Sequence, residues 1–296
     1  MTRRIAVIGD RFMLPSLFVE ALEKIPAALD IRTLEQPWPD EPMVHGYAGT
    51  GLYGLKEFMG DPDEIVEFIG DAEILVTHLA PISAGMLERL PELKLVGVSR
   101  GGPVNIDMKA AKARGVKVVN APGRNASAVA EFTIGAILAE TRLITRGHTS
   151  LSQGQWRGDL YRADLTGREL SEMTVGVIGY GHVGSKVVRL LKAFGCRILV
   201  TDPYVQLDPA DSADGVQQVA LETLLAESDV VTLRGAMLET FAVEPPPEDW
   251  PLLKLPNVTL TPHIAGASVK TVTYAAGLIA EDVRRYLAGE PLLRLC

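Results

Sequence analysis

The sequence has few of the features that mark secreted, metal-binding or membrane proteins. Only two of its 296 residues are cysteines, Cys196 and Cys296, and they do not show the spacing of a metal site. None of its apolar stretches is long and uninterrupted enough to span a bilayer, and the run Ile5–Ile8 is far shorter than the core of a signal peptide. We therefore expect a cytoplasmic protein with no bound metal and no membrane partner.

Positive charge is also scarce. The chain carries 29 Lys and Arg against 37 Asp and Glu, a net charge of −8, and it contains no block of five or more basic residues. Nucleic acids and anionic membranes bind basic patches, so the composition disfavours both as partners. We expect a small-molecule ligand instead.

The sequence does contain a regular alternation of short apolar strands and helical segments. A length of 296 residues suggests two domains, and 47% hydrophobic residues suffice for a large core. In the first 120 residues we predict strands at Ile5–Ile8, Ile31–Thr33, Ile74–Thr77, Leu95–Val98 and Val116–Val119, and helices at Pro15–Lys24, Asp63–Ile69, Ser83–Leu90 and Ile106–Arg114. This alternation is typical of an α/β fold with a doubly wound parallel sheet.

A second βαβ unit begins near Met173 and continues to a predicted strand at Asp229–Leu233. The segment 127–141 before it is apolar nearly all round a helix, which indicates burial at a domain or subunit interface. A homodimer is one expectation from that segment. The last predicted helix, 268–287, has a single apolar stripe and is expected to dock on the first domain.

The most informative motif is a glycine pattern at the start of the second unit. Gly179-Tyr180-Gly181-His182-Val183-Gly184 follows the apolar strand 174–178 and precedes a helical segment. In a dinucleotide site, Gly179 permits the tight turn, Gly181 lets the backbone approach a pyrophosphate, and Gly184 lets the helix pack close to the strand. His182 and Val183 supply helix N-terminal N–H groups to the phosphates. The alternative is a glycine turn without a ligand, which the strand and helix on either side make less favourable.

An acidic residue stands where such a site needs one. Asp202 follows the predicted strand 197–201, about 20 residues beyond the glycines, where a carboxylate accepts hydrogen bonds from the adenosine ribose. The same carboxylate repels a 2′-phosphate. We predict NAD rather than NADP, with Arg197 and Lys192 as nearby cations that keep NADP open.

His263 is the candidate acid/base residue. It follows the apolar run 258–261, and ligands in open α/β sheets bind outside the carboxyl ends of the strands. A histidine titrates near neutrality and can exchange the proton of a hydroxyl as hydride is transferred. Glu244, hydrogen-bonded to the far ring nitrogen, would orient the ring. A structural histidine is the alternative.

These motifs together resemble the D-isomer-specific 2-hydroxyacid dehydrogenases, the family that includes phosphoglycerate dehydrogenase. The resemblance covers most of the chain. It lies in Ser99–Asp107, Asn120–Glu131, Gly179–Gly184 with Asp202, Leu238–Pro245 and Thr261–Ser268. It implies that His263 is the acid/base, that Glu244 is its partner, and that the backbone around Arg100 and Gly101 binds the substrate carboxylate.

The resemblance also implies two domains and a cofactor set. Residues 1–121 plus 265–296 would form a flavodoxin-like substrate domain, and residues 122–264 a Rossmann domain that binds NAD. Glu239 stands where the family usually has an aspartate near the nicotinamide. Pro203, Thr232 and Gly266 complete the predicted cofactor-binding residues.

Two residues of the predicted substrate site have open alternatives. Arg100 stands where many family members have glycine, and it either meets a phosphate or second carboxylate of the substrate or pairs with an acid of the protein. His78, after the strand 74–77, either lines the same cleft or is a loop histidine in water.

The sequence departs from the family at 233–235. The strand 229–233 runs through Arg234 into a second strand candidate, 235–239, whereas neighbouring parallel strands need a crossover of about a dozen residues or more. The family has a helix, a strand ending in Asn-x-x-Arg-Gly and another helix here, on the order of fifty residues. That strand carries the arginine that binds the substrate carboxylate, and Arg234 does not align with it. Two explanations stay open: the protein lacks the segment, or only the printed sequence does.

Three functions are compatible with these patterns. The first is an NAD-dependent oxidoreductase that moves hydride between the nicotinamide and C2 of a small D-2-hydroxy acid. The second, suggested by the missing arginine, is an NAD(H)-binding protein without turnover that senses redox state or acts as a scaffold. The third, an enzyme acting on amino acids or thioethers, is disfavoured by the Thr-Pro-His-Ile-Ala-Gly run at 261–266.

Overall fold

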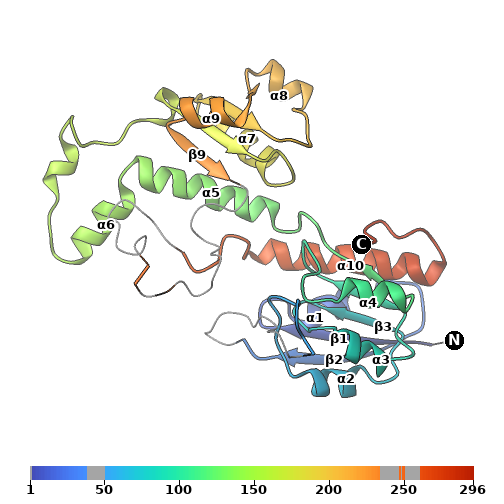
Figure 1. Ribbon diagram of the computed structural model, residues 1–296. Helices are drawn as coiled ribbons and strands as arrows, with labels where there is room; N and C mark the ends of the chain where they lie inside the picture. The colour runs from blue at the N-terminus through green and yellow to red at the C-terminus, as the bar shows by residue number, and fades with distance from the viewer. Residues whose placement is uncertain (1, 39–50, 234–246, 248, 251–260) are drawn as a thin grey trace. The chain divides into compact units, whose positions relative to one another are not determined.

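The computed structural model describes residues 2–38, 51–233, 247, 249–250 and 261–296. The chain divides into two compact units (Figure 1): unit 1 comprises Met1–Arg124 and Ser268–Cys296, and unit 2 comprises Asn125–Ala267. Each unit contains one parallel sheet, so the predicted α/β class with two doubly wound sheets is confirmed. The roles of the units as substrate and NAD domains stay predictions.

The sheet of unit 1 has five parallel strands in the order β2-β1-β3-β4-β5. Its strands are β1 (Arg3–Asp10), β2 (Leu29–Gln36), β3 (Ile74–Thr77), β4 (Leu95–Val98) and β5 (Lys117–Val119). All five coincide with predicted strands. The order reverses between β1 and β3, which is the flavodoxin-like order with its ligand crevice at that switch point.

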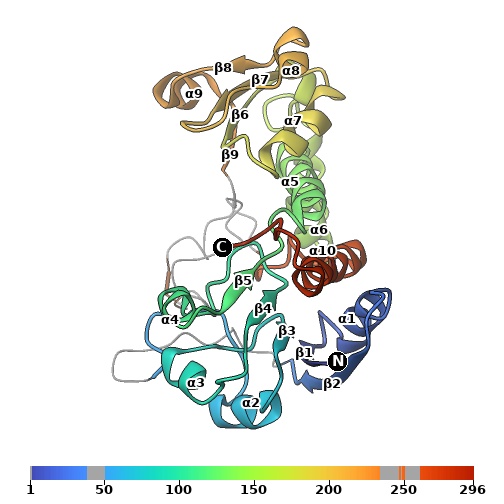
Figure 2. The same ribbon diagram turned by 90° about the vertical axis from the view of Figure 1, so that its right-hand side faces the viewer.

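Helices cover both faces of this sheet (Figure 2). Helices α2 (Pro62–Ile69), α3 (Ala84–Glu88) and α4 (Met108–Ala113) pack on the face that carries Ala6 and Ile8, and α1 (Pro15–Leu22) and α10 (Val269–Ala288) pack on the face that carries Ile5 and Val7. Side chains alternate between the faces because the strand period is two. Helix α10 approaches β4 so closely that a Cβ on Gly97 would lie 2.6 Å from Ile279 Cγ2.

Local sequence explains where the helices of unit 1 begin. Asp61 caps α2 by accepting the N–H groups of Asp63 and Glu64 at 2.8 and 3.1 Å, and Pro62 fits the first helical position because its missing N–H needs no partner there. Ser268 caps α10 through the N–H of Thr271 at 3.1 Å. These short polar residues satisfy helix N–H groups that have no carbonyl partner.

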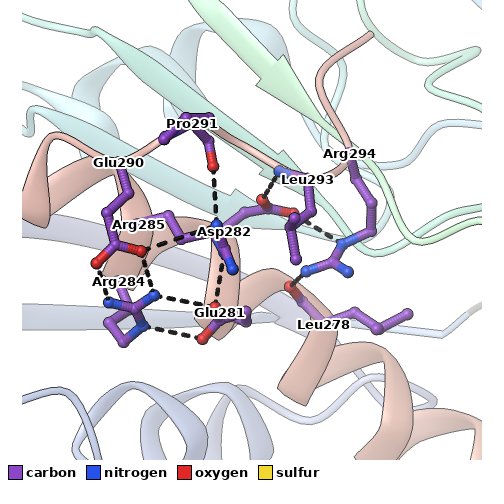
Figure 3. A network of polar contacts seen from close by, with 9 residues as sticks. All are labelled: Leu278, Glu281, Asp282, Arg284, Arg285, Glu290, Pro291, Leu293 and Arg294. Carbon is purple, nitrogen blue, oxygen red and sulfur yellow. Dashed lines mark hydrogen bonds and ion pairs between the residues drawn. The ribbon is translucent and has the colours of Figure 1, made fainter.

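The segment after α10 returns to the sheet as an added antiparallel bridge. Leu295 pairs with Val119, and the N–H of Asn120 donates to the carbonyl of Arg294 at 3.2 Å. Asp282 of α10 anchors this segment (Figure 3): it is fully buried, accepts the Leu293 N–H at 2.7 Å and forms an ion pair with Arg294 at 2.7 Å. The segment is thereby fixed beside β5.

The sheet of unit 2 has four parallel strands in the order β8-β7-β6-β9. Its strands are β6 (Thr174–Ile178), β7 (Arg197–Thr201), β8 (Gln217–Gln218) and β9 (Val230–Leu233). This order equals the first four strands, 3-2-1-4, of the Rossmann fold, whose crevice opens between strands 1 and 4. In unit 2 these are β6 and β9.

The helices of unit 2 lie on both faces of its sheet. Helices α5 (Ala126–Thr141) and α7 (Gly184–Lys192) bury apolar side chains against one face, and α9 (Leu221–Glu227) packs against the other through Leu224 beside Gly176 (Figure 2). The remaining elements are α6 (Ile144–Ser152), the 3-10 helices η1 (Gly158–Tyr161) and η2 (Leu170–Glu172), and α8 (Pro209–Ala213). Within the described ranges, no helix is long and apolar enough to cross a membrane.

Candidate active site and cofactor site

The glycine motif forms the turn between β6 and α7. Gly179 has φ of 95°, a conformation that side chains strongly disfavour. A Cβ on Gly184 would lie 1.9 Å from the Gly179 carbonyl oxygen, whereas a Cβ on Gly181 would meet no atom of the described residues within 4 Å. Gly184 therefore permits the close packing of helix and strand, and Gly181 leaves its side of the turn open.

The start of α7 leaves backbone N–H groups available to a ligand. In the part of the chain that the structure describes, the amides of Ser185 and Val187 donate to helix carbonyls, whereas those of His182 and Val183 have no hydrogen-bond acceptor. His182 is exposed and Val183 is half-buried. Unpaired N–H groups at a helix N-terminus, beside a glycine without a side chain, fit a pyrophosphate.

Asp202 lies immediately after β7 and binds the backbone of the glycine turn. Its carboxylate accepts the N–H of Tyr180 at 2.7 Å on one oxygen and those of Tyr204 and Val205 at 2.8 and 2.9 Å on the other. Asp202 is half-exposed. Pro203 beside it is exposed.

The cations near Asp202 are already paired with other acids. Lys192 contacts Asp211 and Asp214 at 2.6 Å each, and Arg197 contacts Glu227 at 2.7 Å. Neither cation is left to neutralise a 2′-phosphate, which supports NAD over NADP.

Thr232, His263 and Gly266 are the remaining predicted site residues of unit 2 that the structure describes. Thr232 is buried within β9 and pairs in register with Val177 of β6. His263 is exposed and has φ of 53°, a left-handed conformation that is uncommon for residues other than glycine and is often found at functional sites. A Cβ on Gly266 would lie 2.6 Å from Asn125 Nδ2. Glu239, Glu244 and Arg234 lie outside the described residues, so the partnership of Glu244 with His263 stays a prediction.

In unit 1, His78 belongs to a buried polar cluster at the carboxyl ends of β1 and β3. His78 is 3% exposed, which shows that the alternative of a loop histidine in water is wrong. Its Nδ1 lies 2.7 Å from Asp10 Oδ2, and its Nε2 lies 3.2 Å from Arg124 Nη2. A guanidinium can only donate, so Nε2 accepts from Arg124 and Nδ1–H donates to Asp10.

This hydrogen-bond pattern requires a neutral imidazole. Burial is the largest cause that lowers the pKa of His78 to about 4, against the opposing effect of Asp10, and the charges of Arg124 and Arg100 lower it further. The ring therefore remains uncharged at neutral pH. Asp10 is held in turn by the N–H groups of Phe12 and Met13 at 2.9 and 2.8 Å.

The predicted carboxylate-binding loop follows β4 in the same unit. Arg100 hydrogen-bonds the carboxylate of Glu57 and also lies 3.3 Å from the Glu57 carbonyl, so it pairs with an acid of the protein. The Gly101 carbonyl accepts Asn120 Nδ2–H at 2.9 Å. Because the Asn120 N–H is bonded to Arg294, the segment that Asp282 anchors also fixes this loop.

Sequence reasoning missed Asp10 and Arg124. Asp10 ends β1, the strand at the switch point of the unit 1 sheet, and its position at a strand end was the available signal. Arg124 lies inside a motif that carries the family resemblance, but the pattern alone does not show that its side chain meets His78.

Comparisons with known proteins extend these observations. The sequence model described as "D-isomer specific 2-hydroxyacid dehydrogenase, NAD binding domain" matches residues 134–234 and 231–265. A glyoxylate reductase of Korarchaeum cryptofilum is 31% identical over 276 residues, covering 76% of this chain and 83% of the reductase. The chain belongs to the D-isomer-specific 2-hydroxyacid dehydrogenase family. It is an NAD-dependent 2-hydroxyacid dehydrogenase-like enzyme.

Two further likenesses agree with this assignment. D-3-phosphoglycerate dehydrogenase of Methanocaldococcus jannaschii is 33% identical over 279 residues, which cover 77% of the dehydrogenase described here and 52% of that protein. The chain thus spans about half the length of that relative. The solved structure of D-2-hydroxyisocaproate dehydrogenase has the same fold, with a TM-score of 0.74, 21% identity and 99% of each chain covered. The relatives are named as enzymes, which disfavours an NAD(H)-binding protein without turnover.

The comparisons also bear on the departure at 233–235. The two matches to the family model meet at 231–234. The alignment with the Korarchaeum reductase is 276 positions long, but it includes only 76% of the 296 residues of the present chain. About fifty positions of the reductase are therefore aligned with a gap in the present chain. The gap agrees in size with the helix, strand and helix that the sequence lacks.

Proposed function

We propose that this dehydrogenase transfers a hydride between NAD and C2 of a small D-2-hydroxy acid or the corresponding 2-oxo acid. The observation that carries the proposal is the glycine turn, in which, among the described residues, Gly181 leaves open space beside N–H groups that have no acceptor. The match of the same unit to an NAD-binding domain supports it. NAD, when bound, supplies the hydride acceptor or donor.

The proton is handled by His263 in this proposal. As the hydroxyl of the 2-hydroxy acid becomes a carbonyl, a ring nitrogen of His263 accepts its proton, and the same nitrogen returns the proton in the reverse direction. The exposed position and left-handed backbone of His263 support this role, because they hold the ring at a turn instead of in the core. Glu244 is its proposed partner.

The substrate carboxylate is proposed to bind the backbone of the loop at Arg100 and Gly101. The hydrogen bond from Asn120 to the Gly101 carbonyl restrains this loop, and a restrained loop loses less conformational entropy when a ligand binds. The Arg100 side chain is engaged by Glu57, and its backbone N–H donates to the Val98 carbonyl at 2.8 Å. The proposal therefore assigns carboxylate binding to the backbone N–H of Gly101.

The expected activity depends on whether the protein contains the segment that the sequence lacks at 233–235. Intact mass spectrometry of protein from its native source separates the two explanations: 31.9 kDa means that the segment is absent from the protein, and a value about 5 kDa higher means that it is present. A protein without the segment would turn over substrate more slowly, because no aligned arginine stabilises the substrate carbonyl.

A spectrophotometric assay tests the proposed function. Purified protein with NADH is screened against a panel of 2-oxo acids by loss of NADH absorbance, and oxidation of at least one is expected. His263→Ala should lower kcat about 100-fold or more, as expected for loss of a general acid/base, whereas Arg89→Ala, at an exposed arginine of unit 1, should not change it. No oxidation with any member of the panel, or full activity of His263→Ala, would contradict the proposal.

Exposed apolar residues lead us to propose a homodimer as well. Helix α6 has no buried residue, and Ile144 and Leu151 on it are each 58% exposed. Trp156 and Tyr161, which follow, are 85% and 94% exposed. Four large apolar side chains exposed within 18 residues of chain favour a protein interface at this segment. Light scattering should give the mass of a dimer, and Ile144→Glu should give a monomer.

The free thiols Cys196 and Cys296 are compatible with a proposed cytoplasmic location.

A further inference from the structure

Arg124 is partly buried, and its guanidinium has no carboxylate partner among the described residues. Its Nη2 donates to His78 Nε2 at 3.2 Å, and its Nη1 lies 3.8 Å from the Met13 sulfur. Its Nε is buried and has no hydrogen-bond partner in the described part of the chain. The group also lies 5.8 Å from the centre of the Phe12 ring. A buried cation normally has an anion as its partner.

The neighbouring acids are committed elsewhere. Asp10 is occupied by two backbone N–H groups and His78, and Glu57 is paired with Arg100. Burial and the charge of Arg100 lower the pKa of Arg124 to about 10, against the opposing effect of Asp10. The site therefore has unused capacity for negative charge.

The orientation of the guanidinium is fixed. Asp10 accepts the Nδ1–H of His78, which presents the lone pair of Nε2 to Arg124. Because His78 stays neutral near pH 7, it directs Arg124 without adding a positive charge. His78 is therefore a positioning residue for Arg124.

The cluster lies at the sheet edge where a ligand of unit 1 is expected. Asp10 and His78 follow β1 and β3, the strands at the switch point. The Arg100 carbonyl accepts the N–H of Ala121 at 2.7 Å, and the Ala121 carbonyl accepts the N–H of Arg124 at 3.3 Å. Two hydrogen bonds thus join Arg124 to the loop that is proposed to hold the substrate carboxylate.

We infer that Arg124 binds a second anionic group of the substrate, so that the preferred substrate is a 2-hydroxy or 2-oxo acid bearing a further carboxylate or phosphate. This inference rests on the proposed function. The planar N–H groups of Arg124 that lack acceptors match the oxygens of either group. The carboxylate and phosphate forms differ in charge and size, and the experiments distinguish them.

Steady-state kinetics test the inference. Pyruvate provides one anionic group, 2-oxoglutarate a second carboxylate, and 3-phosphohydroxypyruvate a phosphate. Arg124→Met should raise KM for the better of the two doubly anionic substrates about tenfold to 100-fold, the range for a charged hydrogen bond, while kcat stays within a few-fold. KM for pyruvate should not change. The matched control Arg89→Met removes an exposed arginine of unit 1 and should behave as wild type. An equal change for pyruvate, or no change for any substrate, overturns the inference.

Ligand-induced thermal shifts separate this inference from the proposed function. Malonate and inorganic phosphate are compared with acetate at constant ionic strength, without NADH. Wild type should be stabilised more by at least one dianion than by acetate, and Arg124→Met should lose that difference. Absence of the difference in wild type, or its survival in the variant, overturns the anion site. If no 2-oxo acid is turned over but the shift depends on Arg124, the proposed function fails and the anion site stands. Should Arg124→Met fail to fold, Arg124→Lys is the second variant. It retains the positive charge without the planar guanidinium, and the difference in thermal shift between dianion and acetate should be reduced.

Discussion

The buried His78 makes a prediction about stability in acid. In the unfolded chain its pKa is the ordinary 6.5, and in the folded protein burial lowers the pKa to about 4. Between these values the unfolded state binds more protons than the folded state, so the free energy of unfolding falls as the pH falls through this window. Burial favours the neutral ring against the opposing effect of Asp10, and the positive charges of Arg124 and Arg100 add repulsion.

The size of the effect follows from the two pKa values. Their difference corresponds to about 3 kcal/mol once the pH is below 4, and about 2 kcal/mol of this is lost between pH 7 and pH 5. Other groups also titrate in this range, but they are shared by wild type and a variant that lacks the imidazole. The comparison of the two isolates the contribution of His78.

Urea denaturation followed by circular dichroism at pH 7, 6 and 5 measures this contribution. His78→Gln should be less stable than wild type at pH 7, because it disturbs the bonds to Asp10 and Arg124, yet its stability should fall by about 2 kcal/mol less on going to pH 5. Arg89→Gln, at an exposed arginine, should follow wild type. If the stabilities of wild type and His78→Gln fall in parallel with pH, His78 does not titrate as described and the reasoning is refuted.

Three other substitutions follow from contacts in the structure. Gly181→Ala has room in the turn and should abolish NADH binding, measured by tryptophan fluorescence quenching, with an unchanged melting temperature; Gly135→Ala, also at an open position, is its control. Gly184→Ala would force the helix from the strand and should cost about 3 kcal/mol in urea denaturation, so a stability equal to wild type contradicts the packing. Asp282→Asn leaves Arg294 without its counter-charge and should cost about 3 kcal/mol, whereas a cost below about 1 kcal/mol would show that the ion pair is dispensable.

Most of the fold could be predicted from the sequence because its strands are short apolar runs with clear boundaries. The segments 74–77 and 95–98 are strands with every residue buried, as a parallel sheet covered on both faces requires. The glycine motif was also readable, since its spacing reflects backbone geometry. The helix limits are less well predicted: α1 ends at Leu22 and α3 at Glu88, each two residues before the predicted end, because helix ends fray and lack a strong stop signal there.

The polar cluster of unit 1 could be predicted only in part. A histidine after a strand end is visible in the sequence, but its burial depends on Asp10 and Arg124, which lie 68 and 46 residues away. The partner of Arg100 was likewise open, because Glu57 is 43 residues distant. Such contacts depend on which strand ends lie side by side in the folded protein, and hydrophobic periodicity does not predict that arrangement.

The composition of unit 1 from two separate stretches of chain has a consequence for biosynthesis. Its sheet comes from the first 124 residues, but α10 supplies Val272, Ala275, Ala276, Ile279 and Val283 to cover one face. Helix α1 covers part of that face, but the part under α10 remains open during translation until the whole of unit 2 and then α10 have left the ribosome. Unit 2 is continuous in sequence and can fold before its neighbour is complete. The nascent N-terminal stretch of unit 1 is therefore the stage at which this protein depends most on chaperones, and α10 completes the folding of the unit.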